Sequence, residues 1–281
     1  MQIARTIAEF RAARAGLPGP VGLFPTLGGI HAGHLALVDQ ARAENASVVA
    51  TLFLNPTQFA PSEDLDRYPA NEANDLAQLE AHGVDLVLAP PRAEIYPDGF
   101  AVTVHVGGVS ERLEGARRPG HFDGVTTVVL KLLNITSPDR AYFGEKDAQQ
   151  LRVIRQLVRD LDLPVDIVAC PTVRDPDGLA LSSRNAYLSP EERTAALAIS
   201  RGLQLASDAF GAGERNADNL RYLVEKELEG QLLIRPDYVS LADDEALQEL
   251  EGEVSGLALL SVAVHIGSTH LIDNITLGDG L

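Results

Sequence analysis

Cysteine, methionine and tryptophan are almost missing from this sequence. Its 281 residues include one cysteine, one methionine and no tryptophan. The single cysteine, Cys170, excludes an internal disulfide framework and is typical of a protein kept in a reducing compartment. Cys170 ends the apolar run of residues 165–170, so we expect it to be a small buried core residue.

Positive charge is also scarce. The chain has 23 lysines and arginines against 40 aspartates and glutamates, which gives a formal net charge of −17. Broad binding to nucleic acids or to anionic membranes needs a basic surface, so this balance argues against both partners. It does not exclude a small anionic substrate, because a few local cations decide whether such a ligand binds.

Long apolar runs are absent too. No run approaches the ~20 residues that a membrane-spanning helix requires, and the N-terminal segment lacks the apolar centre of a signal peptide. Hydrophobic residues nevertheless make up 45% of the chain, which is enough for a sizeable core. We therefore expect a cytoplasmic protein of one large or two modest domains, at about 100–200 residues per domain.

Strand-like and helix-like patterns alternate along the chain as far as Pro171. Expected strands cover residues 21–24, 48–54, 84–88, 141–143 and 165–169, and expected helices begin near 35 and cover 72–82, 125–134 and 147–161. This alternation predicts an α/β fold, a Rossmann-like parallel sheet with helices on both faces. Beyond Pro171, helices at 190–209 and 217–229 precede strands at 237–241, 257–264 and 271–277. We predict two domains, residues 1–174 and a smaller C-terminal α+β domain of residues 175–281.

The most informative motif is the glycine-rich stretch of residues 25–34, Pro-Thr-Leu-Gly-Gly-Ile-His-Ala-Gly-His. It joins an expected strand to an expected helix and places His31 and His34 on one face of the first helical turn. Glycines allow close approach of the backbone to a ligand, and a helix N-terminus favours phosphate, so the pattern suits a bound triphosphate. An ordinary turn with surface histidines is the alternative. A zinc site is disfavoured because no further pair of ligands is evident.

Two further clusters follow expected strands. Residues 55–58 offer Asn55 and Gln58 as polar contacts for a substrate, although Asn-Pro is equally typical of a turn. Residues 143–150 offer Lys146 for phosphate and Asp147 and Gln150 at the start of a helix. A capped helix beside a solvated lysine is the alternative there.

Serine and arginine mark the remaining clusters. Residues 182–184, Ser-Ser-Arg, offer two hydroxyls and a guanidinium for phosphate oxygens, with a serine-rich linker as the alternative. The glycine-rich loop of residues 115–125 carries two arginines and is by itself more typical of a solvated loop. Such a set of clusters with phosphate-compatible chemistry is unusual for a structural protein.

Taken together, these segments resemble the pantothenate synthetase (pantoate–β-alanine ligase) family of the nucleotidylyltransferase superfamily. The matching segments run in order along the chain, at residues 25–34, 53–59, 118–125, 144–147, 177–185 and 271–274. The resemblance implies a Rossmann-like domain with a C-terminal lid, a homodimer, ATP as a substrate and Mg²⁺. It implies that pantoate and β-alanine are condensed to pantothenate, a coenzyme A precursor, through a pantoyl-adenylate, with release of AMP and pyrophosphate.

The resemblance also implies roles for single residues. The expected catalytic residues are His31, His34, Lys146, Ser182, Ser183 and Arg184. The expected ATP-binding residues are Leu27, Gly28, Gly29, Ile30, His31, Ala32, Gly33, His34, Gly144, Glu145, Lys146, Asp147, Val173, Leu181, Ser182, Ser183 and Arg184. Gln58 and Gln150 are expected to contact the substrates, and Asn55 is added from its place beyond the strand. Asp75 and Gln78 share one helix face and are candidate metal or phosphate partners.

The chain departs from the family pattern at three positions. Leu27 and Leu181 stand where the family commonly has methionine, and both changes preserve apolar volume. His270 stands where an arginine is usual, which puts a C-terminal charge contact in doubt.

Rival functions remain open. A nucleotidylyltransferase with another acceptor would share the fold and the ATP motifs, although residues 55–58 and 120–124 favour pantoate. Retention of His31, His34, Lys146 and Arg184 together argues against a non-catalytic nucleotide sensor. A tRNA-acting synthetase shares the His-x-Gly-His signature, but a chain with a net charge of −17 offers no evident tRNA surface.

Overall fold

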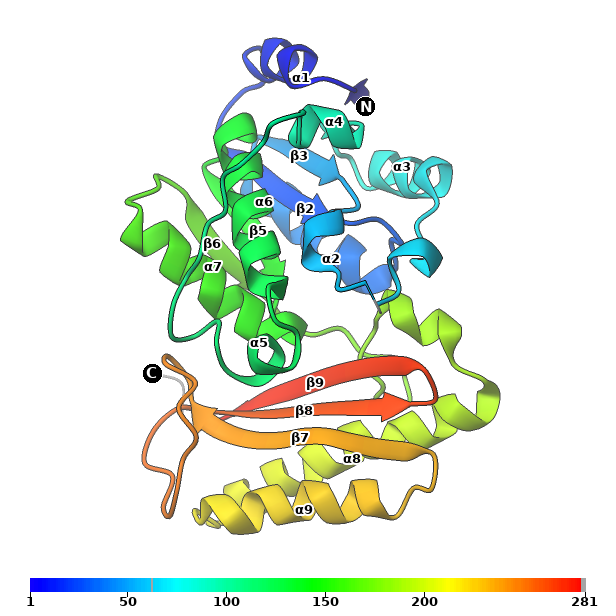
Figure 1. Ribbon diagram of the computed structural model, residues 1–281, viewed down its shortest axis with the longest axis vertical. Coiled ribbons are helices and arrows are strands. Elements are labelled where there is room, and N and C mark those ends of the chain that lie inside the picture. The colour runs from blue at the N-terminus through cyan, green and yellow to red at the C-terminus, as the bar shows by residue number, and fades with distance from the viewer. Residues whose placement is uncertain (62, 279–281) are drawn as a thin grey trace. The chain divides into compact units, whose positions relative to one another are not determined.

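The computed structural model describes residues 1–61 and 63–278 (Figure 1). The chain divides into two compact units. Unit 1 comprises Met1–Glu145 and Gln149–Pro171, and unit 2 comprises Lys146–Ala148 and the chain from Thr172 onward. The division suggested by the sequence lies slightly later, after residue 174. Among the described residues, no helix has the length and hydropathy needed to span a membrane.

Unit 1 is built on a six-stranded sheet in which every strand pair is parallel. The strands are β1 (Gln2–Ala4), β2 (Val21–Thr26), β3 (Ser47–Leu52), β4 (Leu86–Leu88), β5 (Arg140–Gly144) and β6 (Asp166–Cys170). Their spatial order is β1-β4-β3-β2-β5-β6. The chain moves outward from β2 in one direction through β3 and β4, and in the other through β5 and β6. The switch point of the sheet therefore lies between β2 and β5, where ligands bind in folds of this class.

Helices cover both faces of this sheet. They are α1 (Ile7–Arg14), α2 (Ala32–Glu44), α3 (Glu72–Ala81), α4 (Arg92–Ile95), α5 (Leu113–Arg117), α6 (His121–Thr136) and α7 (Ala148–Asp160), with short 3₁₀ turns η1 (Pro56–Gln58), η2 (Leu65–Arg67) and η3 (Glu145–Asp147). Successive strand residues enter different cores, as Leu23 and Phe24 show. Leu23 packs in the cluster that includes α6 and α7, and Phe24 in the cluster that includes α2 and α3. This alternation is the period-2 geometry of a strand buried on both faces.

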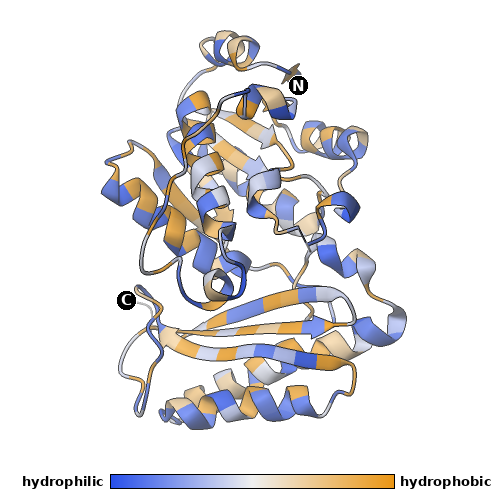
Figure 2. Ribbon diagram, viewed as in Figure 1, coloured by the Kyte–Doolittle hydropathy of each residue, from blue (hydrophilic) through white to orange (hydrophobic). Residues whose placement is uncertain are grey.

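Unit 2 packs two long helices against an antiparallel sheet. After the 3₁₀ turn η4 (Ser183–Tyr187) come α8 (Pro190–Gly211), α9 (Ala217–Glu229), β7 (Ile234–Asp243), β8 (Ala258–Ile266) and β9 (Thr269–Leu277). The three strands pair in chain order. Ser189 and Glu192 form a capping box at the start of α8, and Pro190 occupies its first turn. Figure 2 shows apolar and polar residues alternating along α9, whose apolar residues join the core of this unit.

The predicted fold class is confirmed, with several differences at the element level. The pattern did not predict β1, α4 or α5, which are only three to five residues long. Helix α6 begins at His121 rather than near 125, because Gly120 adopts a left-handed conformation (φ 81°) that starts the helix earlier. Cys170 is buried as expected, with 2% of its surface exposed.

Candidate active site

The loop between β2 and α2, residues 27–31, is held in place by one buried carboxylate. Asp75 on α3 is 1% exposed. Its Oδ1 accepts a hydrogen bond from the Ile30 N–H (2.8 Å), and its Oδ2 accepts from the Gly29 N–H (3.0 Å) and the Asn71 N–H (3.3 Å). The Gln78 amide, one turn further along α3, donates to the Ile30 carbonyl (3.4 Å). A glycine-rich loop thus gains a fixed backbone path from a neighbouring helix.

Gly28 is required by this arrangement for two reasons. Its φ is +96°, a conformation that side chains rarely adopt. A Cβ atom at this position would also lie 2.9 Å from Oδ2 of Asp75. The glycine therefore lets the loop pass directly over the carboxylate that anchors it.

His31 and His34 stand at the beginning of α2. His31 is the N-cap residue, and its Nδ1 accepts a hydrogen bond from the Gly33 N–H (3.1 Å). A neutral His31 therefore carries its proton on Nε2. The His31 and His34 rings stack with centroids 4.0 Å apart and planes 25° apart. The loop and the helix start thus present main-chain N–H groups and two imidazoles together, which suits an anion such as phosphate.

These contacts bear on the expected metal role of Asp75 and Gln78. Mg²⁺ prefers an octahedron of oxygen ligands, whereas both oxygens of Asp75 already accept main-chain N–H groups. The geometry fits a positioning role for Asp75 better than a metal-binding one, and the metal assignment stays a prediction.

The segment after β3 is likewise fixed by a buried polar group. Asn55 has no exposed surface. Its amide donates to Oε1 of Gln58 (2.9 Å) and to the Gly124 carbonyl (3.2 Å), and its Oδ1 accepts from the Tyr96 hydroxyl (2.8 Å). Asn55 thus holds the Gln58 side chain from a buried position, and its expected contact with a substrate stays a prediction. Gln58 keeps its Nε2 without a hydrogen bond among the described residues, so this amide can still donate.

Helix α6 approaches this segment so closely that only glycine fits at position 124. A Cβ atom there would lie 2.4 Å from the Thr57 carbonyl oxygen and 2.7 Å from the Gln58 nitrogen. Gly124, the last residue of the motif Gly120-His121-Phe122-Asp123-Gly124, therefore sets the position of Gln58.

The sequence of the arginine-bearing loop before α6 is typical of a solvated loop, but in the structure Arg118 of this loop is ion-paired. Arg118 forms two hydrogen bonds to Glu63, both 2.8 Å long, and also lies 3.1 Å from His121 Nε2. His121 in turn lies 2.8 Å from the Gln58 carbonyl oxygen through its Nδ1. Burial raises the pKa of the Glu63 carboxyl, but the hydrogen bonds and charge of Arg118 outweigh it and hold that pKa below its usual range. The loop is an ion-paired support for Gln58.

Neighbouring glutamines at the start of α7 differ in their surroundings. Gln149 is 6% exposed, and its amide donates to the carbonyls of Val109 (2.8 Å) and Arg112 (2.7 Å). Gln150 is half-buried and makes no hydrogen bond within the described residues. Gln149 is therefore a structural residue that sequence reasoning missed, and Gln150 keeps its amide available for a ligand.

In unit 2, the C-terminal strand holds two of the predicted ATP-binding segments. Asp273 on β9 pairs with both terminal nitrogens of Arg174, at 2.5 and 2.9 Å. A β-bridge joins Arg174 to Ala180, and the Leu181 N–H donates to the Val173 carbonyl (3.0 Å), so a small hairpin forms.

The residue after Asp273 holds the second segment. The Asn274 amide donates to the Lys146 carbonyl (2.8 Å), which fixes the turn that carries Lys146. Ser182 caps η4 by accepting from the Arg184 N–H (3.3 Å). The Arg174–Asp273 pair spans 99 residues, and no local sequence pattern could have revealed it.

The predicted residues therefore fall into two groups. Unit 1 contains residues 27–34, Asn55, Gln58, Asp75, Gln78, Gly144, Glu145 and Gln150. Unit 2 contains Lys146, Asp147, Val173 and residues 181–184.

These features define the class of protein. It is a doubly wound α/β protein whose glycine-rich loop and helix N-terminus present amides and two imidazoles beside the switch point of the sheet. A family model described as pantoate-beta-alanine ligase matches residues 2–276. The chain belongs to the pantoate–β-alanine ligase family.

Relatives from other organisms agree. The pantothenate synthetase of Roseiflexus castenholzii is 57% identical over 277 residues, 99% of each chain. That of Chloroflexus aurantiacus is 54% identical over 281 residues, 100% of each chain.

Solved structures agree as well. The pantothenate synthetase of Thermus thermophilus is 48% identical, with a TM-score of 0.93, over 98% of this chain and 99% of that one. A pantoate–beta-alanine ligase from Francisella tularensis, complexed with beta-gamma ATP and beta-alanine, is 35% identical, with a TM-score of 0.80, over 98% and 97%. The predicted family and the prediction of a ligase are confirmed.

Proposed function

We propose that this chain condenses pantoate with β-alanine in an ATP-dependent reaction that yields pantothenate, AMP and pyrophosphate. The observation that carries the proposal is the loop of residues 27–31, fixed over buried Asp75, with His31 and His34 at the helix start. Family membership supports ATP and β-alanine as substrates, since the Francisella tularensis relative was complexed with both kinds of ligand.

In the first half-reaction, a carboxylate oxygen of pantoate attacks the α-phosphorus of ATP. The bond from that phosphorus to the bridging oxygen breaks, and pyrophosphate leaves with the electron pair. Two anions must meet, so positioning and charge neutralisation supply most of the catalysis. His31 and His34 lie side by side at the start of α2, and both imidazoles stabilise charge that develops on the phosphates.

Other predicted residues supply cations and hydroxyls in this proposal. Lys146 and Arg184 bind phosphate oxygens as charged donors, and Ser182 and Ser183 orient them. The main chain of Gly144, Glu145, Asp147, Val173 and Leu181 completes the ATP site. A lid role for the segment that carries Ser182, Ser183 and Arg184, which would keep water from the adenylate, is part of the proposal.

In the second half-reaction, the uncharged β-alanine amine attacks the acyl carbon of the pantoyl-adenylate. The bond from that carbon to the AMP oxygen breaks, AMP leaves with the electron pair, and the nitrogen loses a proton to water as the amide forms. Gln58 and Gln150 are the proposed readers of pantoate, because each has an uncharged amide that can donate to and accept from a hydroxy acid. Gln58 is additionally placed next to β-alanine. Asn55 supports Gln58 from behind.

Mg²⁺ is proposed as the companion of ATP. Mg²⁺ is usually bound by the phosphates of the substrate together with few protein ligands, and it would neutralise part of the phosphate charge here. A homodimer and a cytoplasmic location are also proposed, the first from the family resemblance and the second from the single buried cysteine. Light scattering after size-exclusion chromatography tests the dimer.

The decisive experiment follows positional isotope exchange in ATP. Exchange with pantoate alone, with net turnover only after β-alanine is added, is the expected result. Exchange that requires β-alanine would refute a free adenylate. Exchange with a phosphorylated alcohol but not with pantoate would identify a nucleotidylyltransferase with another acceptor, and no exchange with any acceptor would indicate a nucleotide-binding protein without catalysis.

A variant at Lys146 tests the assignment of cations. Lys146→Ala should reduce turnover at least tenfold, equivalent to about 1.4 kcal/mol, while the fold stays intact. Lys226→Ala is the matched control, because this lysine is exposed near the end of α9 and has no assigned role. Equal turnover in both variants would reduce Lys146 to a surface cation.

A further inference from the structure

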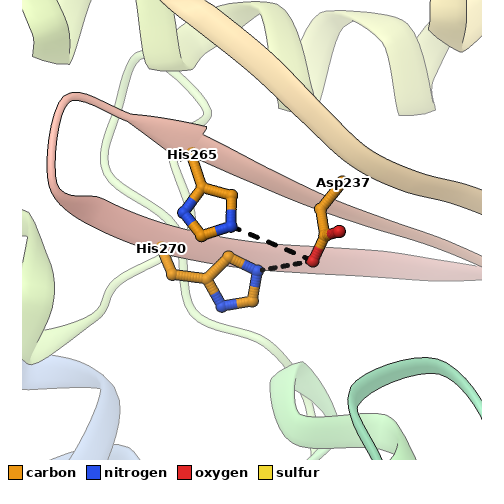
Figure 3. Close-up of side chains that lie close together, drawn as sticks. All are labelled: Asp237, His265 and His270. Atoms are coloured by element: carbon orange, nitrogen blue, oxygen red, sulfur yellow. Dashed lines mark ion pairs between the residues drawn. The ribbon is translucent and has the colours of Figure 1, made fainter. Parts of the chain in front are cut away.

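Three side chains that commonly bind metal ions meet at one end of the antiparallel sheet of unit 2. They are Asp237 on β7, His265 on β8 and His270 on β9 (Figure 3). Oδ2 of Asp237 lies 3.5 Å from Nε2 of His270 and 4.0 Å from Nε2 of His265. All three ligand atoms lie within 4.8 Å of one another, and no other such group occurs among the described residues.

The backbone brings these residues together by two separate devices. His265 and His270 are directly opposite each other across the β8–β9 hairpin, and their ring centroids are 4.6 Å apart. Asp237 lies where the β7–β8 register shifts between Pro236 and Tyr238. Asp237 is the residue without a register partner there, as in a β-bulge. Arg235 is directly opposite His265, so Asp237, two residues further along β7, points to the face of the sheet that carries both imidazoles.

The geometry matches a transition-metal site more closely than a site for Mg²⁺. With metal–ligand bonds of about 2.0–2.2 Å, neighbouring ligands of a tetrahedral ion lie roughly 3.3–3.5 Å apart. The Asp237–His270 distance already has this value, and the Asp237–His265 distance needs to close by roughly 0.5 Å to meet it. Two imidazoles and one carboxylate are ligands typical of Zn²⁺, Co²⁺ and Ni²⁺, whereas Mg²⁺ prefers oxygen alone.

Solvent access is compatible with exchange of an ion. The side chains of His265, His270 and Asp237 are 34%, 23% and 18% exposed. Water can therefore reach the cluster, while Nε2 of His270 itself is buried. Arg235, the register partner of His265, is the nearest cation in the strand pairing, and it is exposed and can turn away into solvent.

We propose that Asp237, His265 and His270 form a binding site for a divalent first-row transition ion, with Zn²⁺ as the expected occupant. The site is structural. It links all three strands of the sheet at one end, beside the turn between β8 and β9.

Cobalt titration of the full-length protein tests the proposal. Co²⁺ is added without nucleotide, and bound ion is followed by visible absorption and by equilibrium dialysis. The wild type is expected to bind one more Co²⁺ per chain than His270→Arg, with tetrahedral absorption bands that Zn²⁺ displaces. Asp237→Asn and His265→Gln are expected to weaken that binding at least tenfold. Any ion taken up by His31 and His34 is common to all variants and cancels in the comparison.

The arginine variant separates a metal site from a simple ion pair. Arginine cannot ligate a cation, yet it retains the positive charge and can still pair with Asp237. Zn²⁺ is therefore expected to raise the unfolding temperature of the wild type but not that of His270→Arg. His105→Gln is the matched control, because His105 also faces two carboxylates, Asp123 and Glu111, but lies outside the ligand group defined above.

The outcomes are distinct. Equal Co²⁺ stoichiometry and an equal Zn²⁺ effect on wild type and His270→Arg would overturn the proposal and leave the cluster as an ion pair. A variant that fails to fold is recognised by circular dichroism, and the remaining two variants then decide. The same loss of binding in His105→Gln would also overturn it.

Discussion

Replacing Asp75 by asparagine should disable the loop of residues 27–31, which is proposed to bind ATP, while leaving the rest of unit 1 folded. The carboxylate accepts three main-chain N–H groups, from Gly29, Ile30 and Asn71. Asparagine has the same shape but only one acceptor oxygen, and its other terminal group is a donor. Whichever way the amide is turned, its NH₂ faces at least one N–H group that it cannot satisfy.

The magnitude follows from the better of the two orientations. With its oxygen in the place of Oδ2, asparagine keeps the bonds from Gly29 and Asn71 and loses the 2.8 Å bond from Ile30. A hydrogen bond to a charged group contributes about 1.5–3 kcal/mol, and the two remaining bonds weaken when the charge is removed. A total of about 2–4 kcal/mol is expected, which corresponds to roughly 30- to 700-fold if all of it appears in ATP affinity.

Calorimetry of ATP binding and urea unfolding together measure how this free energy is divided. Asp98→Asn is the matched control, because Asp98 is exposed and lies in the same unit. Titration at several Mg²⁺ concentrations separates the two roles considered for Asp75. Recovery of ATP affinity at high Mg²⁺ would indicate a metal ligand. ATP affinity within twofold of the wild type, with unchanged stability, would refute the anchoring role.

Three other variants or conditions give direct tests. Gly124→Ala should push η1 aside and lower kcat/KM for pantoate with a stability cost of about 1–3 kcal/mol, whereas Gly107→Ala, with nothing within 4 Å of its Cβ, should do neither. Burial raises the pKa of the Cys170 thiol from 9.0 to about 12, so its thiolate at neutral pH is about a thousandfold rarer, and a thiol reagent should label it only after unfolding. The pKa of Glu63 is lowered in the folded protein, so Glu63→Gln should be less stable than wild type above pH 4.5. Chemical denaturation at several pH values should show this difference in stability vanishing as the pH falls below 4.5 through the folded-state pKa.

The sequence was sufficient for the parts of this protein that depend on local pattern. Helices α8 and α9 have apolar residues at helical spacing, and capping residues stand where they begin. The strands of unit 1 are short apolar runs between turn signals, so their alternation with helices predicts a parallel sheet. The glycine-rich loop could be recognised because the residues around it already indicated a strand and a helix.

Contacts over long sequence distances could not be predicted in the same way. Asp75 anchors a loop 46 residues away, and Asp273 pairs with a residue 99 positions earlier. A lone acidic residue on a helix has the same local pattern whether it binds a metal, caps a loop or faces solvent. Asn55 illustrates this too, because its place beyond a strand suggested a ligand contact but could not reveal that its side chain is buried and holds Gln58.

Buried polar groups therefore fix the loops of the candidate site, as apolar packing fixes the strands of the sheet. Loops that must approach a ligand expose main-chain N–H and C=O groups, and apolar packing cannot satisfy these groups. In this protein, Asp75, Asn55 and Asp273 are each almost fully buried, and each is hydrogen-bonded to a loop or turn that carries predicted site residues. Each of the three loses hydrogen bonds to its loop or turn if its charge or amide is removed, even when the volume of the side chain is unchanged. A core leucine, in contrast, tolerates replacement by another apolar side chain of similar volume. Conservative substitutions at these three positions should therefore reduce activity more than they reduce stability, because each disturbs one loop or turn that carries predicted site residues and leaves the apolar packing of the sheets in place.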